Sequence, residues 1–246
     1  MSYCRIIKWE IRLAAAAVLA IGVLVQGGCG KIAQSRPQTQ QRQFIAVLID
    51  GTGFAERYWQ PSLETATLLL KNVVTPKSIV CVMKIDDYSY EGDNVLLGPK
   101  SMPAGGLRLK VTINKFNEQV AALQAPEQIK PGTDIDGALH MIGDYLAKWP
   151  DAWLNLLVFS DLVEEYEPAG RLGSARRLPE LSRVVSFFVA YGASEGEYKQ
   201  RQESWKRAMA EYGVDGSEVS FFDPQESLAE NLPAEFVRDF CRPPAN

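Results

Sequence analysis

The chain has 246 residues, of which 46% are hydrophobic and 23% are charged, and a formal net charge of −4 from 26 basic and 30 acidic residues. These values are ordinary for a globular protein and exclude a collagen-like chain, a coiled coil, a disordered acidic chain and a polytopic membrane protein. The lack of a basic surplus argues against nucleic-acid binding. The length suits one domain of about 200 residues with an appendage, or two small domains.

The charge is unevenly distributed along the chain. Residues 1–42 contain six basic residues and one acid, for a net charge of +5. The remaining residues contain 20 basic and 29 acidic side chains, for a net charge of −9. We therefore expect a basic leader followed by an acidic body that carries the function.

The first 28 residues have the layout of a secretory signal peptide. A short basic segment, 1–12, precedes the uncharged apolar run 13–25 and a pair of glycines. In a helix, this run would cover about 20 Å, whereas the hydrocarbon core of a bilayer is about 30 Å thick. A membrane-spanning anchor is therefore the weaker interpretation of this segment.

The residues around Cys29 resemble a bacterial lipoprotein signal, in which small residues precede a cysteine that receives lipid. Gly27 and Gly28 fit this pattern, whereas Gln26 departs from the leucine usual at that position. The resemblance implies lipid attachment at Cys29 and a place in the bacterial cell envelope, on the extracytoplasmic side of a membrane. The alternatives are a plain signal peptide and an uncleaved anchor.

A polar, glutamine-rich segment at 29–42 has no apolar periodicity, and it predicts a flexible tether. The body that follows, 43–246, alternates apolar runs with helical patterns. Strands are expected at 44–50, 78–86, 154–160, 183–191 and 218–222, with a short edge strand at 95–97 that forms a hairpin with the strand before it. Helices are expected at 56–72, 113–123, 135–146, 195–212 and 226–240, and 87–110 is otherwise expected to be irregular.

This alternation predicts an α/β fold in three layers: a mostly parallel, doubly wound sheet with helices on both faces. Ligands of such sheets bind at the carboxyl ends of the strands. Three of the expected strands end in or beside an acid, and these acids are Asp50, Asp86 and Asp161. The sequence therefore directs attention to this edge of the sheet.

The residues at this edge resemble those of a von Willebrand factor type A domain, over roughly residues 43–240. In that family, a strand ends in Asp-x-Ser-x-Ser, a threonine precedes a helix, an aspartate follows a later strand, and together they hold a divalent cation. Asp50, Thr52, Thr133 and Asp161 match these positions, so the resemblance implies that they bind Mg²⁺ or a similar cation. Phe54 stands in place of the second serine and cannot coordinate metal, which predicts weaker binding or a metal-free hydrogen-bond network.

Each of these residues also has a simpler interpretation. Asp50 and Asp161 could cap the turns that follow them, and Thr133 could be only a helix cap. Nearby Asp134 and Asp136 are expected to be first-turn acids that the helix dipole favours. His140 falls off the apolar stripe of its helix, and we expect it to be solvated.

The cysteines in the body leave two possibilities open. An oxidising compartment permits a disulfide between Cys81 and Cys241, and a buried free thiol is a common alternative for Cys81. The chain has one histidine and no Cys-x-x-Cys pair, which argues strongly against a zinc site.

The expected function is that of an extracytoplasmic, membrane-tethered binding or adhesion module that recognises a protein partner at the strand ends and is not an enzyme. One alternative is a metal-free scaffold of the same fold. A second is a metal-dependent phosphohydrolase that uses Asp50 and Asp161, although the sequence contains no Walker A loop and no Gly-x-Ser-x-Gly motif.

Overall fold

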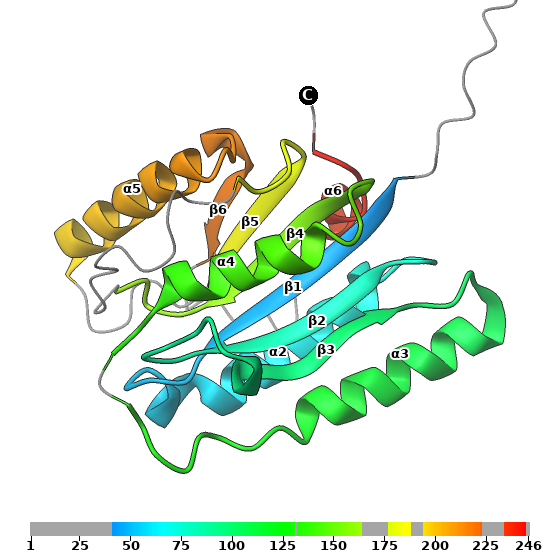
Figure 1. Ribbon diagram of the computed structural model, residues 1–246, viewed down its shortest axis with the longest axis horizontal. Helices are drawn as coiled ribbons and strands as arrows, with labels where there is room; N and C mark the ends of the chain where they lie inside the picture. The colour runs from blue at the N-terminus through cyan, green and yellow to red at the C-terminus, as the bar shows by residue number, and fades with distance from the viewer. Residues whose placement is uncertain (1–40, 131, 164–176, 188–193, 223–233, 245–246) are drawn as a thin grey trace, which may run out of the picture. The chain divides into compact units, whose positions relative to one another are not determined.

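The computed structural model describes residues 41–130, 132–163, 177–187, 194–222 and 234–244 (Figure 1). The expected signal peptide, Cys29 and nearly all of the expected tether lie outside these residues. The chain divides into two units, 1–40 and 41–246, and every described residue belongs to the second. Within the described residues, no helix combines the length and the apolarity needed to cross a membrane.

The described elements alternate between strand and helix, as expected. The strands are β1 (Arg42–Asp50), β2 (Ile79–Ile85), β3 (Val95–Ser101), β4 (Ala152–Phe159), β5 (Ser182–Phe187) and β6 (Val219–Phe222). The α-helices are α2 (Ala55–Val73), α3 (Gly106–Ala121), α4 (Ile135–Leu146), α5 (Glu195–Glu211) and α6 (Ala234–Phe240), and short 3-10 turns cover Gly92–Asn94 and Gly216–Glu218.

The strands form one sheet in the order β3-β2-β1-β4-β5-β6, which confirms the predicted fold class. All neighbouring strands are parallel except β2 and β3, which form the expected antiparallel hairpin. The register places Asp50 of β1 beside Ile85 of β2, so the two loops that follow these strands start next to each other. We call the row of carboxyl-terminal ends of the parallel strands the carboxyl edge, and the row of their amino-terminal ends the amino edge. Neither term refers to the outer strands β3 and β6.

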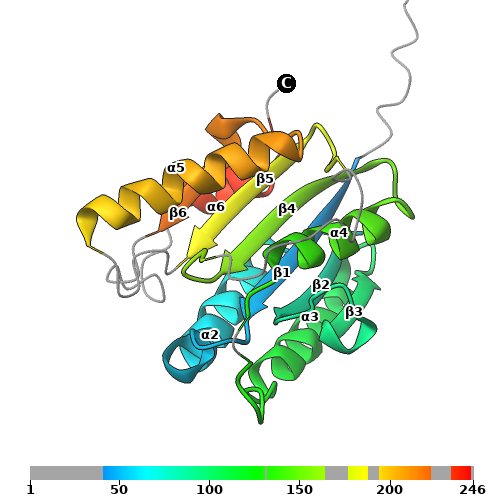
Figure 2. The same cartoon turned by 60° about the vertical axis from the view of Figure 1, so that its left-hand side comes forward.

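Helices cover both faces of the sheet, and each face has its own apolar core (Figure 2). On one face, α4 and α5 pack on the strands through residues such as Ile142 and Met209. On the other face, α2, α3 and α6 do so through residues such as Leu63, Phe116 and Phe240. Because 41–246 is a compact unit of its own, we expect the part from residue 41 onward to fold without the leader.

The region expected to be largely irregular contains more regular structure than its composition indicates. β3 extends to Ser101 although it contains Gly98 and Pro99, because an edge strand tolerates a proline that donates no hydrogen bond to a neighbour. The following helix begins at Gly106 rather than at 113, and Gly105 and Gly106 adopt positive φ angles of 147° and 68° at its start. Glycine is the residue that adopts such angles without strain.

Two other expected element ends lie outside the described residues. β5 is described up to Phe187, and the expected continuation to 191 lies outside the described residues. The closing helix is described from Ala234, and the first part of the expected range, 226–233, also lies outside them.

Cys81 and Cys241 are separate thiols, and burial raises the pKa of Cys81 to about 12.

Candidate functional site

Asp50 is the centre of a hydrogen-bond network at the carboxyl edge. It is the last residue of β1 and is fully buried. Its Oδ1 accepts hydrogen bonds from the backbone amide of Thr52 at 2.9 Å and from the Thr52 hydroxyl at 2.6 Å. Its Oδ2 accepts one from the Ser160 hydroxyl at 2.7 Å. The carboxylate is therefore held by three donors from the two loops that follow β1 and β4.

The hydroxyl of Thr133 joins this network from the loop before α4. The Thr52 and Thr133 hydroxyl oxygens are 3.1 Å apart, and both side chains are buried. Thr133 thus meets the loop after β1, although Thr52 and Thr133 are 81 positions apart. The network now contains one carboxylate and three hydroxyl groups from three separate loops.

Asp134 fixes the loop that carries Thr133. Its amide donates to the carbonyl oxygen of Asp86 at 2.8 Å, and its carboxylate accepts from the amides of Gly137 and Ser89, both at 2.8 Å. A Cβ atom at position 137 would lie 2.2 Å from Asp134 Oδ2, so this approach requires glycine. Asp134 is therefore the N-cap of α4, whereas the simpler interpretation gave that place to Thr133 and made Asp134 a first-turn acid.

Asp161 approaches the network from the loop after β4. Its Oδ1 accepts from the amide of Val163 at 3.2 Å, and its Oδ2 lies 3.5 Å from Nη1 of Arg201 on α5. The same guanidinium group donates to the Asp161 carbonyl oxygen at 3.3 Å. The Asp161 side chain is 21% exposed to solvent, so it is the more exposed of the two candidate carboxylates.

Burial and charge act together on Asp50. Burial raises the pKa of Asp50 above its ordinary value, and the negative charge of Asp161 adds to this effect. The hydrogen bonds from Thr52 and Ser160 work in the opposite direction but do not outweigh burial. A carboxylate in this setting gains from any positive charge placed between it and Asp161.

Ser160 and Arg201 are site residues that the sequence did not reveal. Ser160 donates to Asp50 and also accepts from the amide of Leu162 at 3.0 Å, so it connects β1 to the β4 loop. A possible signal was its place directly before Asp161 at a strand end. Arg201 carried no comparable signal, because its contact with Asp161 spans 40 positions and depends on how α5 lies.

The side chain of Phe54 packs in the apolar core and offers no ligand to a metal. It is only 4% exposed, belongs to the core beneath α2, and stacks on Tyr58 with a ring-centre distance of 4.9 Å. The family pattern has an oxygen ligand at this position, so here an aromatic contact replaces it. The remaining candidate ligands are the four predicted residues and Ser160.

The donor set has the chemistry of a hard divalent cation site. Carboxylate and hydroxyl oxygens suit Mg²⁺, which usually keeps several waters. Within the described residues, no three His, Cys, Asp or Glu side chains cluster as metal ligands. Such a cation would therefore depend on Asp50 and Asp161 for charge and on Thr52 and Thr133 for neutral oxygens. These four residues fit that role in chemical type.

A second acid lies at the same edge but has a different environment. Asp86 follows β2 and lies 2.6 Å from Nζ of Lys84 and 3.3 Å from Nζ of Lys130. Burial acts to raise the pKa of Asp86, but hydrogen bonds from its neighbours and the charge of Lys84 outweigh it and lower the pKa. The stem of Lys84 also crosses Gly51, where an added Cβ would meet it at 2.6 Å.

The expectation that His140 is solvated is wrong. His140 is only 5% exposed, and its Nδ1 lies 3.0 Å from the carbonyl oxygen of Asp136. Tyr212, which follows α5, covers it with a ring-centre distance of 6.0 Å and hydrogen-bonds to the Asp136 carboxylate. Tyr212 thus covers this side of α4, which the helical pattern of α4 by itself does not reveal.

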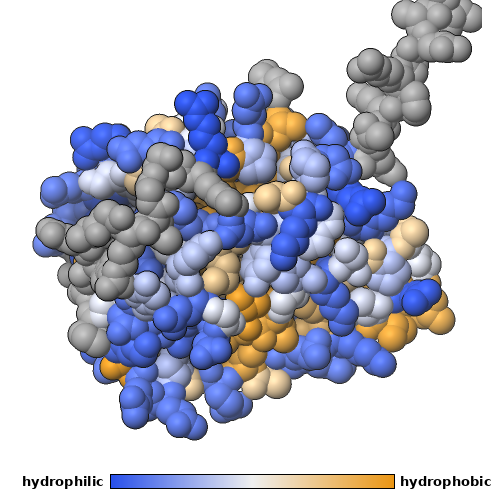
Figure 3. Space-filling view, viewed as in Figure 1, coloured by the Kyte–Doolittle hydropathy of each residue, from blue (hydrophilic) through white to orange (hydrophobic). Residues whose placement is uncertain are grey.

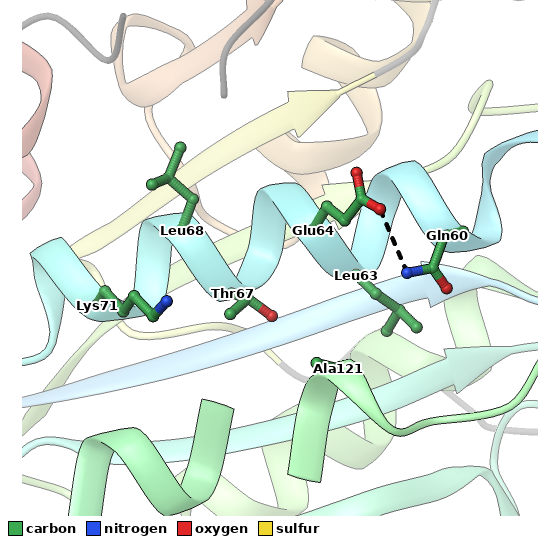
Figure 4. A pocket seen from close by; sticks show the side chains of 7 residues that line it. All are labelled: Gln60, Leu63, Glu64, Thr67, Leu68, Lys71 and Ala121. Carbon is green, nitrogen blue, oxygen red and sulfur yellow. Dashed lines mark hydrogen bonds between the residues drawn. The ribbon is translucent and has the colours of Figure 1, made fainter. Parts of the chain in front are cut away.

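A shallow pocket of about 310 Å³ lies between α2 and α3 (Figure 4). Its floor is apolar, with Leu63 and Ala121, and its rim is polar, where Gln60 donates to Glu64 at 3.3 Å. None of the predicted site residues lines this pocket. The candidate site is therefore an edge of the sheet and not this cavity.

Comparison with known proteins gives similarity in structure only. No protein-family model and no curated protein matches the chain. Solved structures similar to it include the pilus adhesin SpaC from Lactobacillus rhamnosus GG, with a TM-score of 0.50 and 11% identity over 83% of this chain and 31% of that one. A von Willebrand factor type A protein from Catenulispora acidiphila gives 0.49 and 15% over 82% of this chain, which spans 42% of that protein. Manganese-loaded TRAP from Plasmodium vivax gives 0.48 and 12%, over 82% and 74%.

At these identities, the similarity concerns the fold alone. The sheet order, the single antiparallel edge strand and the helices on both faces agree with the fold that the sequence resemblance implied. The chain therefore has a von Willebrand factor A-like α/β fold.

Proposed function

We propose that this chain is a binding module that recognises a protein partner at the carboxyl edge of its sheet, with the help of a divalent cation such as Mg²⁺. The observation that carries the proposal is the environment of Asp50. This fully buried carboxylate accepts hydrogen bonds only from neutral groups in the described structure, and a second acid lies nearby. Asp50, Thr52, Thr133 and Asp161 would hold the cation.

The residues of the chain position the oxygen donors. Thr52 and Ser160 orient the two oxygens of Asp50, and the cap made by Asp134 fixes the loop of Thr133. Arg201 holds Asp161 at the more exposed side of the site. When bound, a hard cation supplies an open coordination position for an acidic group of the partner.

Thermal melting of residues 41–246 tests the cation. A ligand at 100 times its Kd stabilises a protein by about 2.7 kcal/mol, and each kcal/mol raises the Tm of a domain of this size by about 2–4 °C. We therefore expect Mg²⁺ or Mn²⁺ to raise Tm by roughly 5–10 °C relative to EDTA. Asp50→Ala should abolish this shift, whereas Asp87→Ala, which changes a nearby exposed acid, should retain it.

Two results would contradict the proposal in different ways. The absence of any cation-dependent shift in the folded wild-type protein would leave the metal-free scaffold as the better description. Hydrolysis of a generic phosphate ester that Asp50→Ala abolishes would favour the phosphohydrolase. We propose that the chain is not an enzyme, since a protein with neither a Walker A loop nor a nucleophile elbow lacks the best-known devices for such chemistry.

We also propose that the module is held at the extracytoplasmic side of a bacterial membrane by lipid on Cys29. The support is the basic segment, the apolar run and the paired glycines that precede this cysteine. Mass spectrometry of the protein from the membrane fraction tests the attachment. An unmodified Cys29 thiol, or a leader that is still present, would contradict it.

A further inference from the structure

The part of the amino edge around β2, β3 and α3 carries a concentration of positive charge in a body that is otherwise acidic. Segments 65–83 and 94–117 contain six basic residues and no acid, whereas 43–246 as a whole has a net charge of −9. Both segments pass through the amino edge, because α2 and β3 end there and β2 and α3 begin there. The acids of the candidate site lie at the opposite edge.

Two exposed apolar side chains lie among these basic residues on α3. Leu107 and Val111, one turn apart on α3, are 77% and 44% exposed. With about 100° of rotation per residue, Arg108 lies on one side of this pair and Lys110 on the other. All four side chains are exposed. On the face drawn in Figure 3, hydrophobic residues lie among hydrophilic ones at the right-hand side, where α3 begins in Figure 1.

Two further lysines extend the surface next to α3. Lys77 lies in the loop before β2, and its amide donates to the carbonyl oxygen of Pro103 at 3.2 Å. Lys100, at the end of β3, has its Nζ 5.8 Å from the ring centre of Phe116 on α3. Within the described residues, these lysines, Arg108 and Lys110 form no ion pair. We call this region the basic edge surface, and it comprises Lys77, Lys100, Leu107, Arg108, Lys110 and Val111.

The first strand of the body begins beside this surface. β1 begins at Arg42, and the side chain of Gln43 accepts hydrogen bonds from Ser78 at 2.8 Å and from Thr75 at 3.3 Å. These contacts tie the start of β1 to the loop of Lys77. The first described residue, Gln41, therefore precedes β1 at the same edge as the basic edge surface.

We propose that the basic edge surface docks on an anionic phospholipid membrane. Cations on both sides of an exposed aliphatic pair match an interface in which the apolar groups enter the headgroup layer and the cations meet phosphate. Two aliphatic side chains offer far less area than the roughly 800 Å² per partner of a stable protein interface. The charge asymmetry then directs the carboxyl edge, with the candidate site, away from the lipid. The envelope location proposed above supplies the membrane, but the surface itself is independent of Cys29.

Vesicle co-sedimentation of residues 41–246 tests this inference without the leader. We expect binding to vesicles of phosphatidylcholine mixed with phosphatidylglycerol, little binding to phosphatidylcholine alone, and weaker binding as salt screens the charges. Each basic residue near an anionic surface contributes about fivefold to the partition coefficient. Arg108→Gln with Lys110→Gln should therefore lower it about 25-fold, and Leu107→Ser should lower it further.

The matched control is Lys206→Gln with Arg207→Gln on α5, which removes the same charge from a helix elsewhere in the fold. This variant should bind within about twofold of the wild-type protein if the position of the charge matters rather than its sum. Equal binding to both kinds of vesicle, or equal losses in the two double variants, would overturn the proposal. Concentration-dependent dimerisation that Leu107→Ser abolishes would instead assign the surface to a second copy.

The inference and the proposed function can fail separately. The double variant at Arg108 and Lys110 should keep the cation-dependent rise in Tm, which also shows that it is folded. Asp50→Ala should keep vesicle binding. Loss of both vesicle binding and the cation-dependent rise in Tm in either variant would point to general misfolding, which circular dichroism spectra would show. If the double variant is misfolded, the milder change Arg108→Gln alone replaces it.

Discussion

Two neighbouring parallel strands of this sheet have buried aspartates at their carboxyl ends, and these aspartates lie in opposite environments. Asp50 ends β1, and Asp86 follows β2 directly beside it, because Asp50 pairs with Ile85 in the ladder. The partners of Asp50 are two hydroxyl groups and a backbone amide. Asp86 has two lysine ammonium groups within 3.3 Å. The first acid is thus solvated by neutral dipoles and the second by full charges.

The two carboxyl groups consequently differ in pKa. Burial dominates at Asp50 and raises its pKa, whereas at Asp86 the hydrogen bonds and the Lys84 charge outweigh burial and lower it. The fold neutralises Asp86 with side chains from its own strand and from the loop before α4. Among the described residues, no basic side chain forms such a pair with Asp50. This difference separates a structural ion pair from a position at which an external cation would stabilise the fold.

Removing Asp86 should have the largest effect on stability. Asp86→Ala leaves the partly buried Lys84 ammonium without its partner, and breaking a buried pair in this way costs about 3 kcal/mol. Tm should fall by roughly 6–12 °C, as measured by calorimetry. The loss should be the same in Mg²⁺ and in EDTA.

Asp87→Ala is the control for this change. Asp87 pairs with Lys130 at 2.7 Å, but both side chains are more than a third exposed, so the expected loss is below about 1 kcal/mol. A loss at Asp87 as large as that at Asp86 would show that burial does not distinguish the two pairs.

Asp50→Asn should have an effect that depends on the cation. In EDTA, the neutral amide removes a buried charge that has no basic partner, so we expect Tm to rise by a few degrees. In saturating Mg²⁺, the wild-type protein should regain the advantage, because the amide replaces the charged ligand. Differential scanning calorimetry of both proteins, in both conditions, measures this crossover. A variant that is less stable than wild type in EDTA would show that hydrogen bonding to the carboxylate outweighs its desolvation.

The two acids should also have opposite effects on the pH dependence of stability. The pKa of Asp86 is lowered on folding, so its contribution is present above the unfolded pKa of about 3.9 and is lost as pH falls toward the folded pKa. The Tm gap between wild type and Asp86→Asn should therefore close below about pH 4. The pKa of Asp50 is raised, so its contribution is present below about pH 3.9 and is lost as pH rises through the folded pKa. In EDTA, the advantage of Asp50→Asn should accordingly grow from about pH 4 upward.

The fold was predictable from the sequence where the signals are local. The apolar run that ends at Asp50 predicts β1, and the helical period up to Leu146 predicts α4, because both patterns reflect burial along one element. The glycines and proline around β3 and the start of α3 obscured two elements that depend on an edge position. An edge strand needs a neighbour on one side only, so Pro99 could be accommodated there.

The site was predictable in residue type but not in pairing. Asp50, Thr52 and Thr133 were named through a family resemblance, and in the structure Thr52 contacts both Asp50 and Thr133. The role of Ser160 joins residues 110 positions apart, and the burial of His140 depends on Tyr212, 72 positions away. Such pairings depend on how the loops and helices meet in three dimensions, which no periodicity along the chain encodes. The same holds for Lys84 and Lys130, which distinguish Asp86 from Asp50.

Changes at Thr133 should give the smallest effect and the finest test of the comparison. Thr133→Val keeps the shape of the side chain but removes the hydroxyl that meets Thr52 at 3.1 Å, which should cost about 1 kcal/mol in EDTA. Thr133→Ser keeps the hydroxyl and should cost less. If Thr133 is also a cation ligand, the valine variant should lose most of the Mg²⁺-dependent rise in Tm while the serine variant retains it. Equal rises in both variants would limit Thr133 to a structural hydrogen bond and leave the binding of the cation to Asp50 and the other candidate ligands.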